Sequence, residues 1–173
     1  PKLNQLSQQV AALTREGAET RRQVQSHSFG LGLLIEASLL NGDVLLGGTA
    51  RFEFRAGHVW GELAAGAAHH NGIDAWTFTG GAAGGYAVGD GNVQLGAWAR
   101  TLQLSEARVS STGRTVQTPG EISFAGGFVG RWLSNLHGAS GIVEGRVGAV
   151  DLPGDKLGYE INISGGFVWN SGP

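Results

Sequence analysis

The sequence predicts a mainly β protein, an eight-stranded antiparallel up-and-down transmembrane β-barrel preceded by one N-terminal α-helix. Apolar and polar residues alternate in run after run between Ser28 and Trp169, the charges gather on one side of that alternation, and turn residues separate the runs. Successive side chains of a strand point to opposite faces, so each run has one apolar face and one face of small and charged residues. That pattern is typical of a barrel with lipid outside and a filled polar interior.

Residues 1–27 form the first predicted unit and residues 28–173 the second. Pro1 suits the start of a helix, and polar Gln, Arg and Glu fill most other positions of the unit. Its apolar stripe has the spacing of heptad a and d positions: Leu3, Leu6, Val10 and Leu13. The stripe predicts either a short self-associating coiled coil or a surface helix or linker.

Eight strand-like runs of the length usual for membrane barrels follow. One predicted connection, from about Ser105 to Pro119, is long, whereas the others are short and rich in turn residues. Membrane barrels carry long extracellular loops and short periplasmic turns, so both termini are expected in the periplasm. The runs span approximately 28–39, 47–56, 58–68, 75–88, 92–104, 120–133, 140–150 and 157–169.

The polar faces of these runs carry five acids and five arginines. An enclosed interior needs such a balance, because buried charges are tolerable only when they are paired, and Arg suits buried pairing better than Lys. An eight-stranded barrel is just wide enough for side chains to fill, so we expect a closed lumen without a wide water channel. The predicted lumen charge network is Glu36, Arg51, Glu53, Arg55, Glu62, Arg100, Arg131, Glu144, Arg146 and Glu160.

Aromatic residues bracket the apolar faces of several runs. On the fourth and eighth runs the two aromatics lie ten residues apart, which at about 3.3 Å per residue and a tilt of about 40° spans roughly 25 Å, the height of the apolar band. Trp98 does not fit this pattern because it lies on the same face of the fifth run as Arg100. The mismatch predicts a bulge or a shifted boundary in that run. The predicted outer belt is Trp76, Phe124 and Tyr159, and the inner belt is Phe29, Tyr86, Trp132 and Trp169.

In these features residues 28–169 resemble the small eight-stranded outer-membrane β-barrels of Gram-negative bacteria, the OmpA/OmpX type. The last run ends in Gly165-Gly166-Phe167-Val168-Trp169, which resembles the aromatic-ended signal by which such barrels are recognised for insertion. The chain departs from that signal because Asn170-Ser171-Gly172-Pro173 follow the last aromatic. The resemblance implies a place in the bacterial outer membrane, with lipid as a partner.

Composition excludes several functions. The formal net charge is −2 and no basic patch with interleaved aromatics is present, so we expect no nucleic-acid partner. The chain has no cysteine, which rules out disulfides and cysteine-ligated metal, and we expect no cofactor. No apolar stretch approaches the length of a transmembrane helix.

The expected role is structural rather than enzymatic. We expect a membrane anchor whose N-terminal helix mediates self-association, with a trimer slightly preferred, or tethers a periplasmic coiled-coil partner. Two alternatives stay open, a soluble lipocalin-like ligand-binding barrel and an outer-leaflet lipid-modifying enzyme. The second would draw on His69, His70 and the serines at 105, 110 and 111, although no spacing among them indicates a nucleophile and its base.

Overall fold

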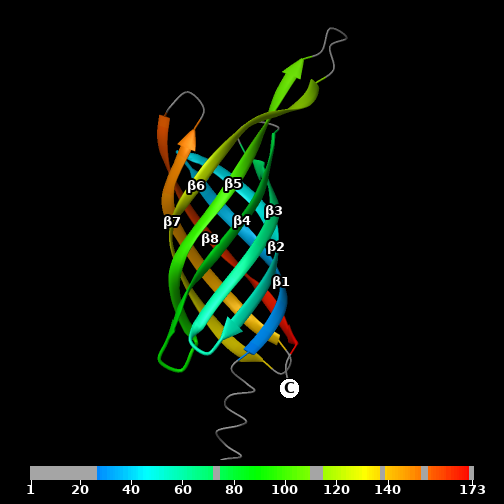
Figure 1. The fold of residues 1–173 in the computed structure, drawn as a ribbon. Coiled ribbons are helices and arrows are strands. Elements are labelled where there is room, and N and C mark those ends of the chain that lie inside the picture. Colours follow the sequence, from blue (N-terminus) through cyan, green and yellow to red (C-terminus); the bar gives the residue numbers. More distant parts are fainter. Residues whose placement is uncertain (1–26, 72–74, 110–114, 137–138, 153–155, 172–173) are drawn as a thin grey trace, which may run out of the picture.

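The computed structural model describes residues 27–71, 75–109, 115–136, 139–152 and 156–171. These residues form one closed barrel of eight antiparallel strands in chain order, in which β8 pairs with β1 (Figure 1). The prediction of a mainly β, eight-stranded antiparallel up-and-down barrel is confirmed for this part of the chain. The strands are β1 (His27–Leu40), β2 (Asp43–Ala56), β3 (Val59–His70), β4 (Trp76–Val88), β5 (Val93–Val109), β6 (Thr115–Leu136), β7 (Ala139–Leu152) and β8 (Lys156–Ser171).

The predicted N-terminal helix falls on residues 1–26, which lie outside the described residues. Within the described ranges, no helix is long and apolar enough to cross a membrane. The first strand begins and the last strand ends at the same end of the barrel, here called the terminal end (Figure 1). The β5–β6 hairpin projects from the opposite end, here called the hairpin end.

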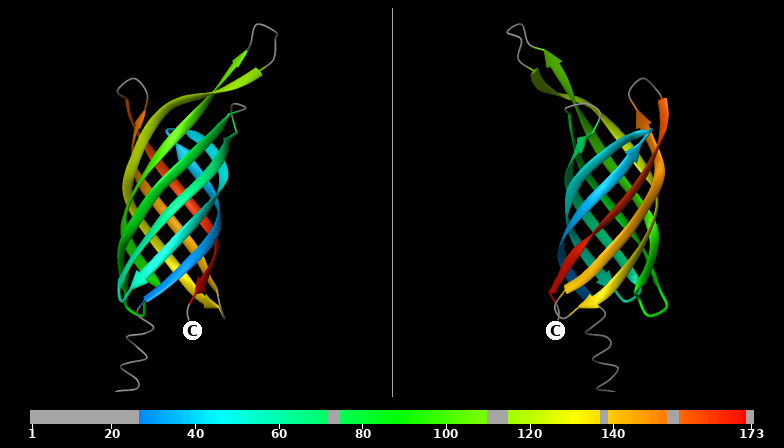
Figure 2. Two further views of the ribbon diagram at one scale, coloured as in Figure 1. Left: turned by 45° about the vertical axis from the view of Figure 1, so that its right-hand side comes forward. Right: turned by 180° about the vertical axis from the view of Figure 1, so that it is seen from behind.

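The prediction of a long connection over residues 105–119 is wrong. Strand β5 continues to Val109 and β6 already begins at Thr115. The pairing of β5 with β4 ends at Leu104 and that of β6 with β7 begins at Phe124, so beyond these points the two strands pair only with each other. Figure 2 shows this hairpin leaning away from the barrel. Its sequence lacks the apolar alternation by which strands are recognised.

The bulge predicted around Trp98 is also misplaced. The β5–β6 ladder runs without interruption from Val93 to Gln103, and its register shifts only between Gln103 and Ser105. Trp98 and Arg100 are 3% and 8% exposed because both point into the lumen. Their shared parity therefore reflects a shared face and not an irregular strand.

Large apolar side chains cover the outside of the barrel on all eight strands. Ile35 is 80% exposed and Phe128 is 76% exposed, and most of the other large apolar side chains on this face are at least 40% exposed. Each alternates along its strand with a buried neighbour that points inward. The large apolar side chains thus point outward, and most of the charged side chains of the strands point inward.

A sealed ion network in the barrel lumen as candidate functional site

Charged side chains from seven of the eight strands meet inside the barrel. Arg55, the tenth predicted member, is only half-buried at the terminal end of β2, and none of the described ion pairs includes it. Without Arg55 the buried set holds five acids and four arginines, so the lumen is not the balanced five-to-five set that the sequence predicts. The nine buried members are Glu36, Arg51, Glu53, Glu62, Arg100, Arg131, Glu144, Arg146 and Glu160.

Six of these side chains form one neutral group, here called the six-residue ion cluster: Arg51, Arg131, Arg146, Glu53, Glu62 and Glu144. Arg51 binds Glu144 in a bidentate manner, with Nη1–Oε2 and Nη2–Oε1 distances of 2.9 and 3.1 Å. The same Nη1 lies 2.8 Å from Oε2 of Glu62. Such paired, charge-assisted bonds are the strong class of hydrogen bond and fix the geometry of both partners.

The other two arginines complete the cluster from β6 and β7. Arg131 donates from Nη1 to Glu53 and Glu62, both at 2.9 Å. Its Nε donates to Gln94, which is also buried. Arg146 donates from Nε to Glu144 at 2.7 Å and from Nη2 to Glu62. Glu62 therefore receives three guanidinium groups from three different strands.

The remaining three charges form a second group, here called the Arg100 cluster: Arg100, Glu36 and Glu160. Arg100 donates to both oxygens of Glu160, with an Nε–Oε2 distance of 3.2 Å, but lies 3.9 Å from Glu36. Glu36 instead accepts the hydroxyl of Thr49 at 2.9 Å and the amide of Asn162 at 3.4 Å. The excess acid of the lumen thus belongs to this cluster.

A small cavity separates the two clusters. It measures about 10 Å³, and its lining includes Glu36, Arg51, Arg100 and Arg146. Oε1 of Glu36 is buried and has no hydrogen-bond partner among the described residues. A space of this size holds about one water molecule, so it cannot serve as a pore or as a site for an organic ligand.

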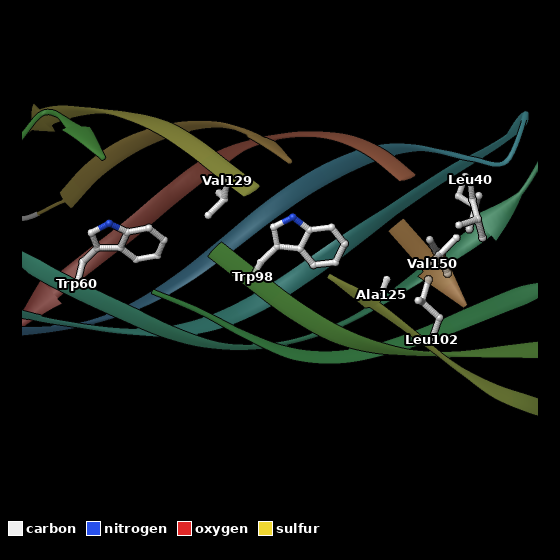
Figure 3. Close-up of a cluster of buried hydrophobic side chains, with 9 residues drawn as sticks. Leu40, Trp60, Trp98, Leu102, Ala125, Val129 and Val150 are labelled. Atoms are coloured by element: carbon white, nitrogen blue, oxygen red, sulfur yellow. The ribbon is translucent and has the colours of Figure 1, made fainter. Parts of the chain in front are cut away.

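Two tryptophans fill the lumen between the charges (Figure 3). The guanidinium of Arg131 lies 3.7 Å from the ring centre of Trp60, and those of Arg100 and Arg146 lie 5.7 and 5.9 Å from that of Trp98. These are cation–π distances. Trp98 therefore contacts a guanidinium of each cluster.

Each indole lies against a glycine on the next strand but one of the wall. A Cβ on Gly96 would lie 2.9 Å from Cζ2 of Trp60, and one on Gly148 would lie 2.8 Å from Cζ2 of Trp98. Neither tryptophan was predicted to lie in the lumen. The signal was present, because Trp60 shares the parity of Glu62 just as Trp98 shares that of Arg100.

Apolar side chains close the lumen on both sides of the charges. One apolar layer lies toward the hairpin end, and in Figure 3 several of its side chains gather beyond Trp98, on the side away from Trp60. The other layer comes largely from the strand segments nearest the terminal end. Charges enclosed between such layers are shielded from bulk water, which strengthens their mutual attraction. The layer toward the hairpin end includes Leu40, Leu45, Leu102 and Val150, and the opposite layer is Leu34, Leu133, Ile142 and Val168.

The aromatic belt residues all lie on the outside of the barrel. Their strand positions put one group near the hairpin end and the other near the terminal end. The group near the hairpin end is Trp76, Phe124 and Tyr159, and the group near the terminal end is Phe29, Tyr86, Trp132 and Trp169.

The two adjacent histidines point to opposite sides of the wall. The His69 ring makes an edge-to-face contact with the outward Trp76 at 5.3 Å between ring centres. His70 is buried, and its Nε2 lies 3.2 Å from Oγ1 of Thr77. The Thr77 hydroxyl is fully buried and hence out of reach of a substrate. Positions 110 and 111 lie outside the described residues, and at 105 only the backbone is described.

Comparison with solved structures identifies the fold. The barrel matches the crystal structure of Neisserial surface protein A, NspA, with a TM-score of 0.54 over 83% of this chain and 96% of that chain, at 10% sequence identity. The chain has the fold of NspA. Ail, the attachment invasion locus protein of Yersinia pestis, solved with the heparin analogue sucrose octasulfate, matches with a TM-score of 0.46, over 83% of this chain and 97% of Ail, at 10% identity. No protein-family model and no curated protein sequence matches the chain.

Proposed function

We propose that this chain is an integral protein of the bacterial outer membrane whose barrel is a sealed anchor and not a channel. The observation that carries the proposal is the polarity of the wall, with large apolar side chains outside and a hydrogen-bonded ion network inside. A soluble lipocalin-like barrel requires the opposite arrangement. In water the exposed outer face would be costly, whereas in lipid it needs no partner.

The closed lumen supports an anchoring role over transport. Both ion clusters are packed against indoles and lie between apolar layers, and the cavity between them holds about one water molecule. An ion crossing this lumen would have to break several buried ion pairs at once. Among the described residues, His70 and Thr77 are buried and cannot reach a substrate. We therefore propose a structural protein and not an enzyme.

The part to be anchored is the N-terminal segment of 26 residues, which joins β1 at the terminal end. The spacing of Leu3, Leu6, Val10 and Leu13 favours association with other helices, either from further copies, with a trimer slightly preferred, or from a periplasmic coiled-coil protein. The terminal end is proposed to face the periplasm because the long hairpin leaves the opposite end.

Three measurements on the full chain test this proposal. The protein should require detergent after extraction from membranes, should show a heat-dependent shift on gels as closed barrels do, and should give no stable porin-like current in planar bilayers. Full solubility without detergent would contradict the membrane location. A large, stable conductance would contradict the sealed lumen while leaving the location intact.

A further inference from the structure

The outer wall over β1, β2 and β3 carries an apolar groove formed by two adjoining hollows. The first measures about 640 Å³ and lies over Ala50 and Ala65. The second measures about 400 Å³ and ends at Asn170. The hollows share Leu31, Phe52 and Trp169 in their linings, so they form one continuous groove, here called the β1–β3 groove.

The groove results from a row of small residues beside a row of large ones. Ala50 and Ala65 are register partners, and the next outward row pairs Phe52 with Leu63. Phe29 and Phe52 stack with their ring centres 5.9 Å apart and form one wall toward the terminal end. The outward side chains that line both hollows are otherwise apolar, and polar groups appear only where the second hollow ends.

We propose that the β1–β3 groove binds one acyl chain of a phospholipid, with the phosphate of the headgroup at the terminal end of the barrel. This inference rests on the membrane location proposed above. The floor of the groove is a single row of small side chains, which suits one extended hydrocarbon chain. A helix is about 10–12 Å across and would rest on the larger side chains beside that row. The volume of each hollow lies within the range of ligand sites, about 300–1,000 Å³.

Charge complementarity supports a phosphate at the terminal end. Arg55 is the register partner of Ser28, one residue beyond Phe29, which lines the second hollow. It is half-buried and takes part in none of the described ion pairs, and the nearby Glu53 is already bound to Arg131. Asn170 on β8 lies where the second hollow ends, and its Nδ2 donates to Oγ of Ser140 at 3.1 Å. Arginine is well suited to phosphate because its guanidinium donates two parallel hydrogen bonds.

Native mass spectrometry of the full chain released from nanodiscs of phosphatidylglycerol tests the proposal. We expect one phosphatidylglycerol per barrel to survive removal of the bulk lipid. Ala65→Phe fills the first hollow and should lower the bound fraction at least fivefold. The matched control is Ala99→Phe, an equally exposed outward alanine on β5 outside the groove, which should leave the bound fraction unchanged. Arg55→Gln should lower it at least threefold without filling the groove.

Each variant is first checked for the heat-dependent gel shift of a folded barrel. Wild-type barrels that fold in nanodiscs but retain no lipid would overturn the groove and leave the membrane location standing, whereas a protein that never enters nanodiscs would overturn both. Equal loss of lipid from Ala65→Phe and Ala99→Phe would also overturn the proposal. So would a groove filled by a second copy, seen as a dimer mass that only Ala65→Phe removes.

Discussion

Glu62 offers the sharpest test of the ion network because three arginines converge on it. It is 1% exposed and accepts hydrogen bonds from Arg51 at 2.8 Å, from Arg131 at 2.9 Å and from Arg146. Glu62→Gln keeps the shape of the side chain but leaves three guanidiniums facing two carboxylates in the six-residue ion cluster. Removing one partner of a buried pair costs about 3–5 kcal/mol. Glutamine still accepts a hydrogen bond, so we expect the free energy of unfolding to fall by about 3 kcal/mol, the low end of that range.

Equilibrium unfolding by denaturant in phospholipid vesicles, followed by tryptophan fluorescence, measures this change. The matched control is Glu121→Gln, which removes the same charge from an exposed position on β6 and should change stability by less than about 0.5 kcal/mol. If Glu62→Gln and Glu121→Gln have equal effects within about 1 kcal/mol, the lumen charges are hydrated and do not act as a buried network.

A second variant separates charge imbalance from lost contacts. Glu62→Leu leaves a positive excess in the cluster, and combining it with Arg146→Met removes that excess. The double variant should therefore be more stable than Glu62→Leu alone, because the two substitutions share one network and are not additive. Additive losses would show that Glu62 and Arg146 do not interact in the lumen.

Three further outcomes are expected. Ile163→Arg, at an outward position 63% exposed, should cost about 2–4 kcal/mol in vesicles; a cost below that of Ser164→Arg would mean that the inside and outside are reversed. Leu133→Ala, in the apolar layer toward the terminal end, should lower the free energy of unfolding by about 2–5 kcal/mol, and an unchanged denaturation midpoint would argue against a packed seal. Deleting residues 1–26 should leave a heat-modifiable barrel that no longer associates, whereas an unchanged mass in detergent would place the association on the barrel wall.

Much of the barrel could be read from the sequence because its signal is local. The alternation that places Ile35 outside and Glu36 inside needs only a strand and two different environments. Turns such as Asn41-Gly42, where both residues have positive φ, mark the strand ends for the same local reason. The β5–β6 extension escaped prediction because its strands pair only with each other beyond Leu104 and Phe124 and do not belong to the barrel wall.

The partners within the lumen could not be read in this way. Parity places Glu62 and Arg146 inside, but only the stagger of the closed barrel brings β3 and β7 to the same level. The same stagger leaves Arg55 at the rim, where parity alone would count it as a lumen residue. Trp60 and Trp98 were missed because aromatics in membrane barrels are expected at the outer interfaces, and that expectation outweighed their parity.

The ion network also bears on how the barrel is made. The Arg51–Glu144 bond joins residues 93 positions apart, and the Arg146–Glu62 bond joins residues 84 apart. No single hairpin can form these pairs, so an open sheet would hold its charges unpaired, and contacts of such long range are intrinsically slow to form. Pairing of β1 with β8 and neutralisation of the six-residue ion cluster are therefore expected to occur in one cooperative step. A half-formed barrel has no low-energy place in a bilayer, and an assembly factor would have to shield its inner face until the last strand closes.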